Sequence, residues 1–330
     1  MAESAPLKIV FMGTPDFAAA SLRHLLAWDG CDVIGVYTQP DRPCGRGQQC
    51  RPSAVKMLAL EHGLDVRQPV NFRDEADVQA LRDFGADILV VAAYGLILPQ
   101  SVLDAAPMGA VNVHGSLLPR YRGAAPIQRA VMNGDAVTGI TIMQVVKQLD
   151  AGPMLLQKAL GIGCDETSGQ LHDQLAELGG RLLVETLARL RAGTIMPIPQ
   201  DDALATYAAK LTKADGLVDW NRTAVEVHAQ VRGVTPWPAA YFTLRREGQK
   251  DVRVTIEPGT IGPLLEQPAV PGTIVGLVDG AIAFACADRT YLVRTIRPAD
   301  KKPMTGEAFW CGYLSRCEGE CPGFAVCEGA

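Results

Sequence analysis

The sequence predicts an α/β protein in which a mainly parallel sheet domain is followed by a smaller β-barrel domain. Up to Arg191, short apolar runs alternate with helical patterns, as in repeated strand-helix units. From Tyr207 onward the pattern changes to one early helix followed by short strands. The chain has 330 residues, of which 48% are hydrophobic and 20% charged. This length and composition are sufficient to bury the cores of two domains.

The first strand and helix of the predicted sheet domain lie near the N-terminus. Leu7–Met12 is an apolar run, and Thr14-Pro15-Asp16 then provides a cap, a proline suited to a first helical turn and an early acid. Repeated units of this kind imply a mainly parallel sheet with right-handed crossovers. Gly13-Thr14-Pro15 is not the glycine fingerprint of a dinucleotide site, which argues against NAD. Further strands are expected at 32–37, 65–68, 88–93, 110–113, 139–146 and 154–160, and helices at 52–62, 74–84, 124–132 and 168–191.

A glycine- and proline-rich loop, Thr38–Pro52, is unusually long for a strand-helix connection. Long irregular loops in compact domains tend to be functional or disordered. Arg42, Arg46 and Arg51 give this loop three positive charges, with only Asp41 against them. On these residues alone, a solvated mobile loop is the structural interpretation and the favoured one. The functional interpretation is an arm that contacts phosphates.

Three polar side chains are expected at one edge of the sheet. Asn112 and His114 lie two residues apart at the end of an apolar run, so they project to the same side of a strand. Asp150 follows the predicted strand 139–146 and precedes a glycine turn. Open α/β sheets hold their ligands beyond the carboxyl ends of their strands. These three side chains are therefore candidates for one site.

The combination of amide, imidazole and carboxylate is typical of acyl transfer. A carboxylate beside an imidazole fixes its orientation and favours its protonated form, and an amide donates to an oxygen that gains charge. Taken singly, each residue also has a structural interpretation as a turn former or a hydrogen-bonded core residue. Gly115-Ser116-Leu117 lacks the pattern of a nucleophile elbow. Direct transfer between two bound substrates therefore fits better than an acyl-enzyme.

The sequence divides into two domains, a linker and a tail. A long helical pattern ends the first domain, predicted at 1–192, and a segment at 193–206 with prolines and paired Asp201-Asp202 is interpreted as a linker. The second domain, at 207–310, has a helical start at 221–232 and then strands that suggest a small barrel of the oligonucleotide-binding kind. Its strands are expected at 241–244, 252–256, 273–277, 281–285 and 291–296.

Charge and hydropathy restrict the location and partners of the protein. The formal net charge of −5 argues against attraction of nucleic acid to the whole surface, so any such binding must use local basic patches. No apolar run reaches the roughly 18 residues of a membrane span, and the N-terminus lacks the order of a secretory signal. We therefore expect a cytoplasmic protein.

The tail, at 311–330, carries Cys311, Cys317, Cys321 and Cys327. Four cysteines this close can hold one tetrahedral metal or two disulfides, although the spacing matches no common zinc motif, and reduced thiols fit equally well. We predict a structural link or metal clip at the terminus. No metal is expected in the core, because the five histidines of the chain are not spaced as ligand pairs.

Four motifs together resemble the 10-formyltetrahydrofolate-dependent formyltransferases, over about residues 7–310. Asn112-Val-His-Gly-Ser-Leu-Leu-Pro119 with the later Leu149-Asp150-x-Gly152 is specific for that superfamily. Gly13-Thr-Pro-Asp-Phe17 and Gln39-Pro-Asp-Arg-Pro43 point to the branch that formylates methionyl-tRNA.

This resemblance implies a Rossmann-like catalytic domain, an oligonucleotide-binding-like barrel that helps to hold tRNA, and a role in translation initiation. The α-amino group of methionyl-tRNA would attack the formyl carbon of 10-formyltetrahydrofolate. Asn112 and protonated His114 would stabilise the oxyanion, while Asp150 would orient His114 and help to move the proton of the amine. No metal would be required, and we expect a monomer.

The resemblance also assigns binding residues. Arg42, with Arg46 and Arg51, would enter the acceptor stem of the tRNA. The folate pocket would be lined by the residues Tyr94, Gly95, Leu96, Ile97, Leu98, Ser116, Leu117, Leu118 and Pro119.

The chain departs from the family pattern in two places. Gln48 and Gln49 stand where members often carry lysines, and Val146-Lys147-Gln148 replaces a more usual Asp-Val-Gly. Two alternatives stay open: a formyltransferase acting on glycinamide ribonucleotide or an amino sugar nucleotide, and a non-catalytic folate- or RNA-binding protein. A formyltransferase with one of these smaller acceptors would not need the second domain or the arginine loop. A non-catalytic binding protein would give no reason for the presence of Asn112, His114 and Asp150 together.

Overall fold

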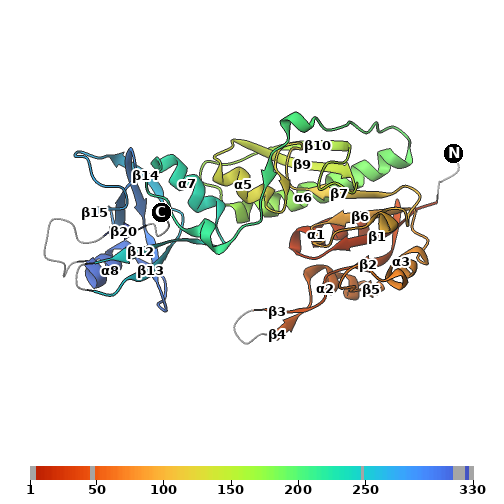
Figure 1. Ribbon diagram of the computed structural model, residues 1–330, viewed down its shortest axis with the longest axis horizontal. Helices are drawn as coiled ribbons and strands as arrows, with labels where there is room; N and C mark the ends of the chain where they lie inside the picture. The colour runs from red at the N-terminus through yellow and green to blue at the C-terminus, as the bar shows by residue number, and fades with distance from the viewer. Residues whose placement is uncertain (1–4, 45–48, 247–248, 315–323, 327–330) are drawn as a thin grey trace. The chain divides into compact units, whose positions relative to one another are not determined.

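The computed structural model describes residues 5–44, 49–246, 249–314 and 324–326. The chain forms two compact units (Figure 1). The first comprises Met1–Pro126, Val137–Gly161 and His172–Ala208, and the second comprises Ile127–Ala136, Ile162–Leu171 and Ala209–Ala330. The domain boundaries expected at 192 and 206 stay a prediction.

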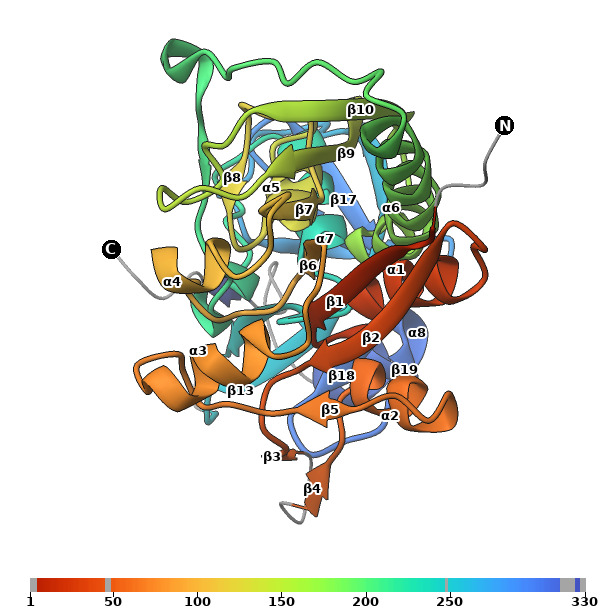
Figure 2. The ribbon, with the colours of Figure 1, turned by 90° about the vertical axis from the view of Figure 1, so that its right-hand side faces the viewer.

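The first unit is built on a seven-stranded sheet with the order β10-β9-β7-β6-β1-β2-β5. The pairs among β1, β2, β5, β6 and β7 are parallel, whereas β9 and β10 add an antiparallel edge (Figure 2). The expected mainly parallel sheet is confirmed. The strands are β1 (Leu7–Gly13), β2 (Cys31–Tyr37), β5 (Val66–Arg67), β6 (Ile88–Ala92), β7 (Ala110–His114), β9 (Val137–Gln144) and β10 (Met154–Gly161).

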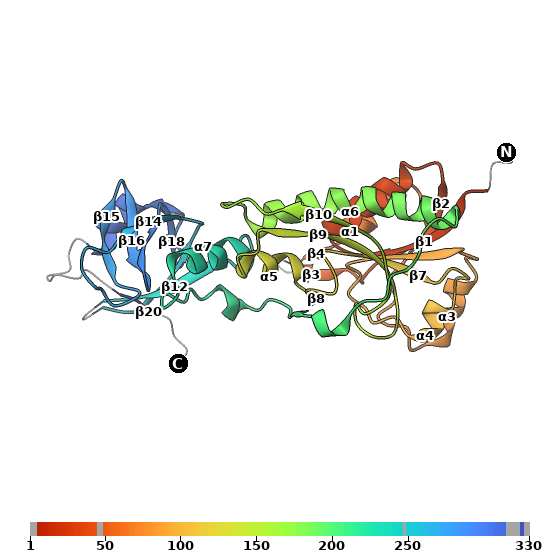
Figure 3. The same cartoon turned by 90° about the horizontal axis from the view of Figure 1, so that it is seen from above.

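Helices cover both faces of this sheet. Figure 3 shows α1 and α6 over one face and α3 and α4 over the other. The central strands β1 and β6 are therefore continuous apolar runs with almost every side chain buried, as expected of parallel strands covered on both sides. The helices are α1 (Asp16–Leu26), α2 (Ala54–Glu61), α3 (Glu75–Arg82), α4 (Gln100–Leu103) and α6 (Ser168–Arg191), with a short 3-10 turn η1 (Asp202–Leu204).

The loop expected to be irregular between β2 and α2 contains a hairpin. Its strands β3 (Arg42–Cys44) and β4 (Gln49–Arg51) pair antiparallel, with Arg42 opposite Arg51. The hairpin was not predicted, because its strands are only three residues long and their proline, glycine and arginine content is typical of loops.

The strand order places a topological switch point in the middle of the sheet. The chain leaves β1 toward β2 on one side, while β6 and β7 lie on the other. Connections diverge from the carboxyl ends of β1 and β6, and ligands of open α/β sheets bind at such a point. The two ends are joined by a hydrogen bond of 3.1 Å from Thr14 Oγ1 to the Tyr94 carbonyl.

The second unit consists of two antiparallel sheets with the orders β19-β18-β13-β12-β20 and β14-β17-β16-β15. Trp220 anchors its core: the ring is 1% exposed and stacks on Phe284 with 4.6 Å between ring centroids. Its strands are β12 (Ala240–Arg245), β13 (Val252–Ile256), β14 (Thr260–Leu264), β15 (Ile274–Val278), β16 (Ala281–Ala285), β17 (Arg289–Val293), β18 (Thr295–Pro298), β19 (Met304–Thr305) and β20 (Phe324–Val326). Its helical segments are α5 (Pro126–Met132), η2 (Lys213–Gly216), α7 (Ala224–Gly233), α8 (Gly306–Phe309) and η3 (Trp310–Leu314).

Two details of the expected barrel differ. The single strand predicted at 291–296 is divided at Arg294 into β17 and β18, which belong to different sheets. Strand β14 was missed, because Gly262 and Pro263 interrupt its pattern. No helix in the described part of the chain combines the length and apolar character needed to cross a membrane.

Candidate active site

Asn112 and His114 are positioned by the packing of β7 against α6. A Cβ added to Gly179 of α6 would lie 2.9 Å from Val113, so the helix approaches this strand closely over Val113. Because side chains alternate along a strand, Asn112 and His114 face the opposite side together. Strand β7 lies between β6 and β9, and both neighbours fix its position.

The structure brings His114 and Asp150 together across 36 residues of sequence. His114 is 5% exposed, and its Nδ1 lies 3.7 Å from Asp150 Oδ2. This separation is longer than a direct hydrogen bond. The other ring nitrogen, Nε2, lies 2.9 Å from the Tyr121 carbonyl. A carbonyl can only accept, so Nε2 carries a hydrogen and Nδ1 is the nitrogen that faces the carboxylate.

Asp150 has an unusual backbone conformation, with φ +49°. Its Oδ2 accepts a hydrogen bond of 2.8 Å from the backbone N–H of Gly123. Gly152 makes the turn possible, because a Cβ there would lie 1.8 Å from the carbonyl oxygen of Gln144. The Asp-x-Gly pattern therefore has a steric cause.

Asn112 is half-buried, and its carboxamide makes no hydrogen bond with any other residue in the described ranges. An amide that is fixed on a strand but has no protein partner is available to a ligand. The chemistry available here is a hydrogen-bond donor for a developing oxyanion, next to an imidazole and a carboxylate.

Ser116–Pro119 is held in place by Thr141, a residue that the sequence did not single out. Thr141 Oγ1 donates to the Ser116 carbonyl at 2.7 Å and accepts from the Leu118 N–H at 3.1 Å. Gln157 adds a hydrogen bond of 2.9 Å to the Leu118 carbonyl. The hydroxyl of Ser116 donates to the Arg120 carbonyl at 2.7 Å, so it is not presented as a nucleophile.

Residues 94–98 follow β6 and leave the sheet next to the end of β7. The Tyr94 side chain is buried, and burial raises the pKa of its phenol. Gly95 has φ +79°, and a Cβ there would lie 3.1 Å from Gln39 Nε2, so a larger residue would be strained. Ile97 is 92% exposed, which leaves a large apolar side chain available to an apolar ligand.

The hairpin β3–β4 presents Arg42 and Arg51 as exposed side chains. Arg42 Nη2 donates to Gln39 Oε1 at 2.8 Å, whereas the acid Asp41 is engaged by Lys56 at 2.6 Å. The hydrogen bond from Lys56 holds the pKa of the Asp41 carboxyl below its usual value. Asp41 therefore neutralises a lysine on α2, and within the described ranges neither Arg42 nor Arg51 forms an ion pair. Arg46 lies outside the described residues.

Most of the predicted metal clip or link of the tail lies outside the described residues. Cys311 lies in η3, and Cys317, Cys321 and Cys327 lie outside the described residues. Within the described ranges, no group of three or more His, Cys, Asp or Glu could hold a metal ion. The clip stays a prediction.

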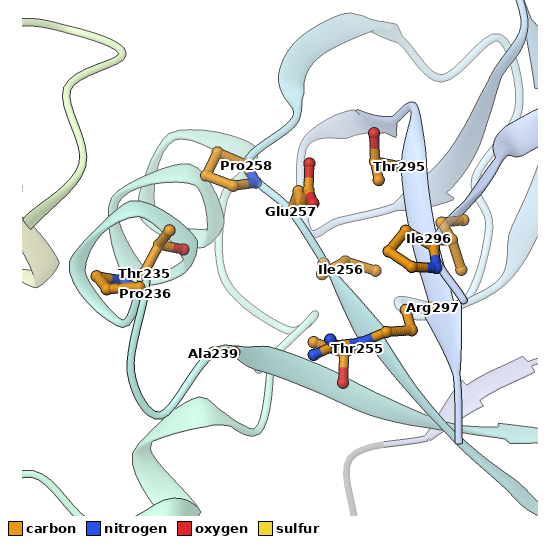
Figure 4. Close-up of a pocket in the computed structure, with 11 residues that line it drawn as sticks. Thr235, Pro236, Ala239, Thr255, Ile256, Glu257, Pro258, Thr295, Ile296 and Arg297 are labelled. Atoms are coloured by element: carbon orange, nitrogen blue, oxygen red, sulfur yellow. The ribbon is translucent and has the colours of Figure 1, made fainter. Parts of the chain in front are cut away.

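The second unit contains a cavity of about 300 Å³ (Figure 4). It is lined by residues that follow α7, by the end of strand β13 and the residues after it, and by strand β18, among them Pro236, Thr255, Glu257 and Arg297. None of the predicted site residues lines it, so this cavity is separate from the group around His114.

Gly123 is the position where a substitution tests the local geometry most simply. Its φ is +118°, and a Cβ would lie 2.7 Å from the Ala208 carbonyl oxygen. Gly123→Ala should therefore lower the free energy of unfolding by about 1–3 kcal/mol for the backbone conformation and by about 1–3 kcal/mol more for overpacking. Chemical denaturation measures this loss.

Gly109→Ala is the matched control, because Gly109 has φ +71° but nothing within 4 Å of an added Cβ. The free energy of unfolding of Gly109→Ala should fall only by the cost of a positive φ at a non-glycine residue, without overpacking. Equal losses for the two variants would mean that the close approach to Ala208 is not rigid.

Comparison with known proteins identifies the family. The Formyl transferase pattern matches residues 7–187, and the Formyl transferase C-terminal domain pattern matches residues 210–314. Methionyl-tRNA formyltransferase of Nitratidesulfovibrio vulgaris is 99% identical over 330 residues, which are 100% of both chains.

Two solved structures show the same fold at low identity. An N-formyltransferase from Helicobacter canadensis, in complex with folinic acid and dTDP-3-aminofucose, has a TM-score of 0.63 and 14% identity over 87% of this chain and 98% of that chain. Glycinamide ribonucleotide transformylase 1 from Symbiobacterium toebii has a TM-score of 0.50 and 20% identity over 60% of this chain and 96% of that chain. With two formyltransferase domains and a near-identical full-length relative, the chain belongs to the methionyl-tRNA formyltransferases, the 10-formyltetrahydrofolate-dependent enzymes that formylate initiator methionyl-tRNA.

Proposed function

We propose that Asn112, His114 and Asp150 catalyse direct transfer of the formyl group from 10-formyltetrahydrofolate to the α-amino group of methionyl-initiator tRNA. The observation that carries this assignment is the pairing of His114 with Asp150 at 3.7 Å, together with the Asn112 amide, which has no hydrogen-bond partner among the described residues. The two substrates meet at this edge of the sheet, where strand ends and a topological switch point favour ligand binding.

The reaction needs one attack and one proton transfer. The lone pair of the amine forms a bond with the formyl carbon, and the carbonyl electrons move to the oxygen. Asn112 donates to this oxyanion, and His114, with hydrogen on both ring nitrogens, adds positive charge beside it. The bond from carbon to N10 of the folate then breaks, the amine loses a proton and N10 gains one.

Asp150 is the proposed acceptor of the amine proton. Its Oδ2 is engaged by the Gly123 N–H and faces His114, whereas its Oδ1 has no hydrogen-bond partner among the described residues. One carboxylate can therefore orient the imidazole through one oxygen and accept a proton through the other, directly or through water. An acyl-enzyme is not needed, because the Ser116 hydroxyl is committed to a carbonyl.

The folate is proposed to lie against the residues 94–98 and 116–119. Support comes from their position at the ends of neighbouring strands β6 and β7 and from the exposed Ile97. Thr141 and Gln157 hold the second of these segments in shape. Such fixed loops lower the entropic cost of positioning the formyl group.

The tRNA is proposed to contact the arginines of the hairpin and a face of the second unit. On that face Thr255 pairs with both Tyr241 and Arg297, so an aromatic ring, a hydroxyl and a guanidinium form a row across three strands. Arg253 lies 3.6 Å from the centroid of the Tyr241 ring. Proteins bind the RNA backbone through positive charge and bind single-stranded bases by stacking them on aromatic rings.

Arg42→Ala should raise KM for methionyl-tRNA roughly tenfold, the effect of losing about 1.4 kcal/mol, and should leave KM for the folate unchanged. The reason is that Arg42 provides charge for phosphates, and that its hydrogen bond goes to Gln39 and not to a proposed folate residue. Steady-state kinetics with each substrate varied in turn measures both constants.

Arg82→Ala is the control for charge alone, since Arg82 is an exposed arginine of α3 that pairs with Glu75 at 2.8 Å. It should leave both constants near those of the parent enzyme. Equal losses for tRNA and folate in Arg42→Ala would refute the proposed role of the hairpin.

The choice of acceptor is tested by offering 10-formyltetrahydrofolate with three acceptors in turn. Charged initiator tRNA should be formylated, while glycinamide ribonucleotide and an amino sugar nucleotide should not. The family assignment and the second unit favour the tRNA. Formylation of a small acceptor at a comparable rate would contradict the proposal, and no turnover with any acceptor would favour a binding protein. We further infer that the enzyme acts in the cytoplasm, where its tRNA substrate is found, and that it acts as a monomer.

A further inference from the structure

We propose that Gln200 is a positioning residue for Asp150, and that the segment 200–208 holds the catalytic pair in place. The inference rests on the proposed catalytic roles of His114 and Asp150. It concerns a segment whose sequence indicates only a linker, because the residues 200–208 are polar and have weak secondary-structure signals.

Gln200 binds the turn that carries Asp150. Its Nε2 donates to the carbonyls of Asp150 and Gly152, at 2.8 Å each. These two bonds bracket the residue with φ +49°, a conformation that a non-glycine residue keeps only when its surroundings hold it there. The side chain of Gln200 therefore fixes the direction in which the Asp150 carboxylate points.

The amide of Gln200 is itself oriented by Arg122. Arg122 is 1% exposed; its Nε donates to Gln200 Oε1 at 3.0 Å and its Nη2 donates to Asp202 Oδ1 at 2.7 Å. An arginine can only donate and the two carbonyls can only accept, so the oxygen of Gln200 must face Arg122 and its nitrogen must face the turn. A reversed amide would lose all three hydrogen bonds.

The backbone of the same segment supports His114. Strand β11 (Tyr207–Ala208) pairs in parallel with β8 (Arg122–Gly123), and Thr206 Oγ1 accepts from the Tyr121 N–H at 2.9 Å. The Tyr121 carbonyl is the partner of His114 Nε2, and the Gly123 N–H is the partner of Asp150 Oδ2. Both catalytic side chains are thus bound to a stretch of backbone that the segment 200–208 holds by strand pairing.

A positioning role predicts which kinetic constant changes. Among the described residues, the hydrogen bonds of Gln200 go to Arg122, Asp150 and Gly152, and none goes to the proposed folate segments or the arginine hairpin. Its loss should therefore not change ground-state binding. A displaced carboxylate would weaken the interactions that develop during amine attack, and such a change appears in kcat. Residues that orient the ligands of metal sites typically contribute factors of about 10–100, and we expect an effect of the same size for a residue that orients a catalytic carboxylate.

Gln200→Glu is the sharpest test. The new carboxylate still accepts from Arg122, so no buried guanidinium loses its partner, but it cannot donate to the carbonyls of Asp150 and Gly152. We expect kcat to fall about 10–100-fold, with KM for both substrates within about threefold. The thermal midpoint should also fall, because two internal hydrogen bonds are lost and a carboxylate then faces two carbonyl oxygens. Gln79→Glu makes the same change at an exposed position of α3, where Gln79 donates to Asp83, and should have kcat like the parent.

A double mutant separates positioning from general damage. In an Asp150→Asn background, Gln200→Glu should cost little further activity, because the group it positions is already removed. Parent-like kcat in Gln200→Glu would overturn the proposal, as would losses that multiply in the double mutant. Parent-like kcat in Asp150→Asn itself would instead overturn the catalytic assignment, so the two failures are distinguishable.

Discussion

The Asn112→Ala enzyme is expected to bind both substrates and to turn them over roughly 10²–10³-fold more slowly, the usual cost of removing one oxyanion donor. The physical reason is that the carboxamide has no protein partner among the described residues, so its hydrogen bond is made only with the substrate. This bond strengthens as charge develops on the formyl oxygen. The loss should therefore fall on kcat, with little change in either KM.

Asn112→Asp is the matched variant for this experiment. It keeps the shape of the side chain but replaces the donating amide by an acceptor, which repels an oxyanion. Its kcat should be no higher than that of Asn112→Ala, and the thermal midpoints of both should be close to that of the parent, since no internal hydrogen bond is lost. Parent-like kcat in Asn112→Asp would show that another group stabilises the oxyanion.

Much of the proposed catalytic group could be predicted from sequence, because the placement of its residues follows from strand geometry. Residues two apart on a strand must face the same side of the sheet. This rule placed Asn112 and His114 together without knowledge of the fold. Asp150 was found because a carboxylate between a strand and a glycine turn lies at the same edge of the sheet. The mainly parallel sheet followed from alternating strand and helix patterns, which are strong local signals.

The supporting residues could not be predicted, because their roles depend on contacts between distant segments. Gln200 reaches Asp150 across 50 residues of sequence, and Arg122 reaches Gln200 across 78. No local pattern marks such a residue, since side chain to backbone hydrogen bonds impose no periodicity. The same reason explains why Thr141 was missed, although it fixes Ser116 and Leu118.

The hairpin that carries Arg42 and Arg51 shows a different limit of prediction from sequence. Its composition indicated charge and irregular structure, and the charge is present on exposed Arg42 and Arg51. The pairing of two three-residue strands depends on cross-strand contacts that propensity does not describe. The ion pair between Asp41 and Lys56 could not be predicted from sequence either, because it joins the loop before β3 to helix α2.

The shared role of Asp150, which orients His114 and accepts the amine proton, is tested most directly by single-turnover formyl transfer with Asp150→Asn. Asparagine keeps the size of the side chain and one oxygen, but it cannot accept a proton from the amine. At saturating 10-formyltetrahydrofolate and methionyl-tRNA, the transfer rate should fall by a factor of about 10²–10⁴, as for the loss of a general base. The dissociation constants of both substrates should stay the same. A single-turnover rate within twofold of the parent enzyme, with both substrates bound, would contradict a catalytic role for Asp150.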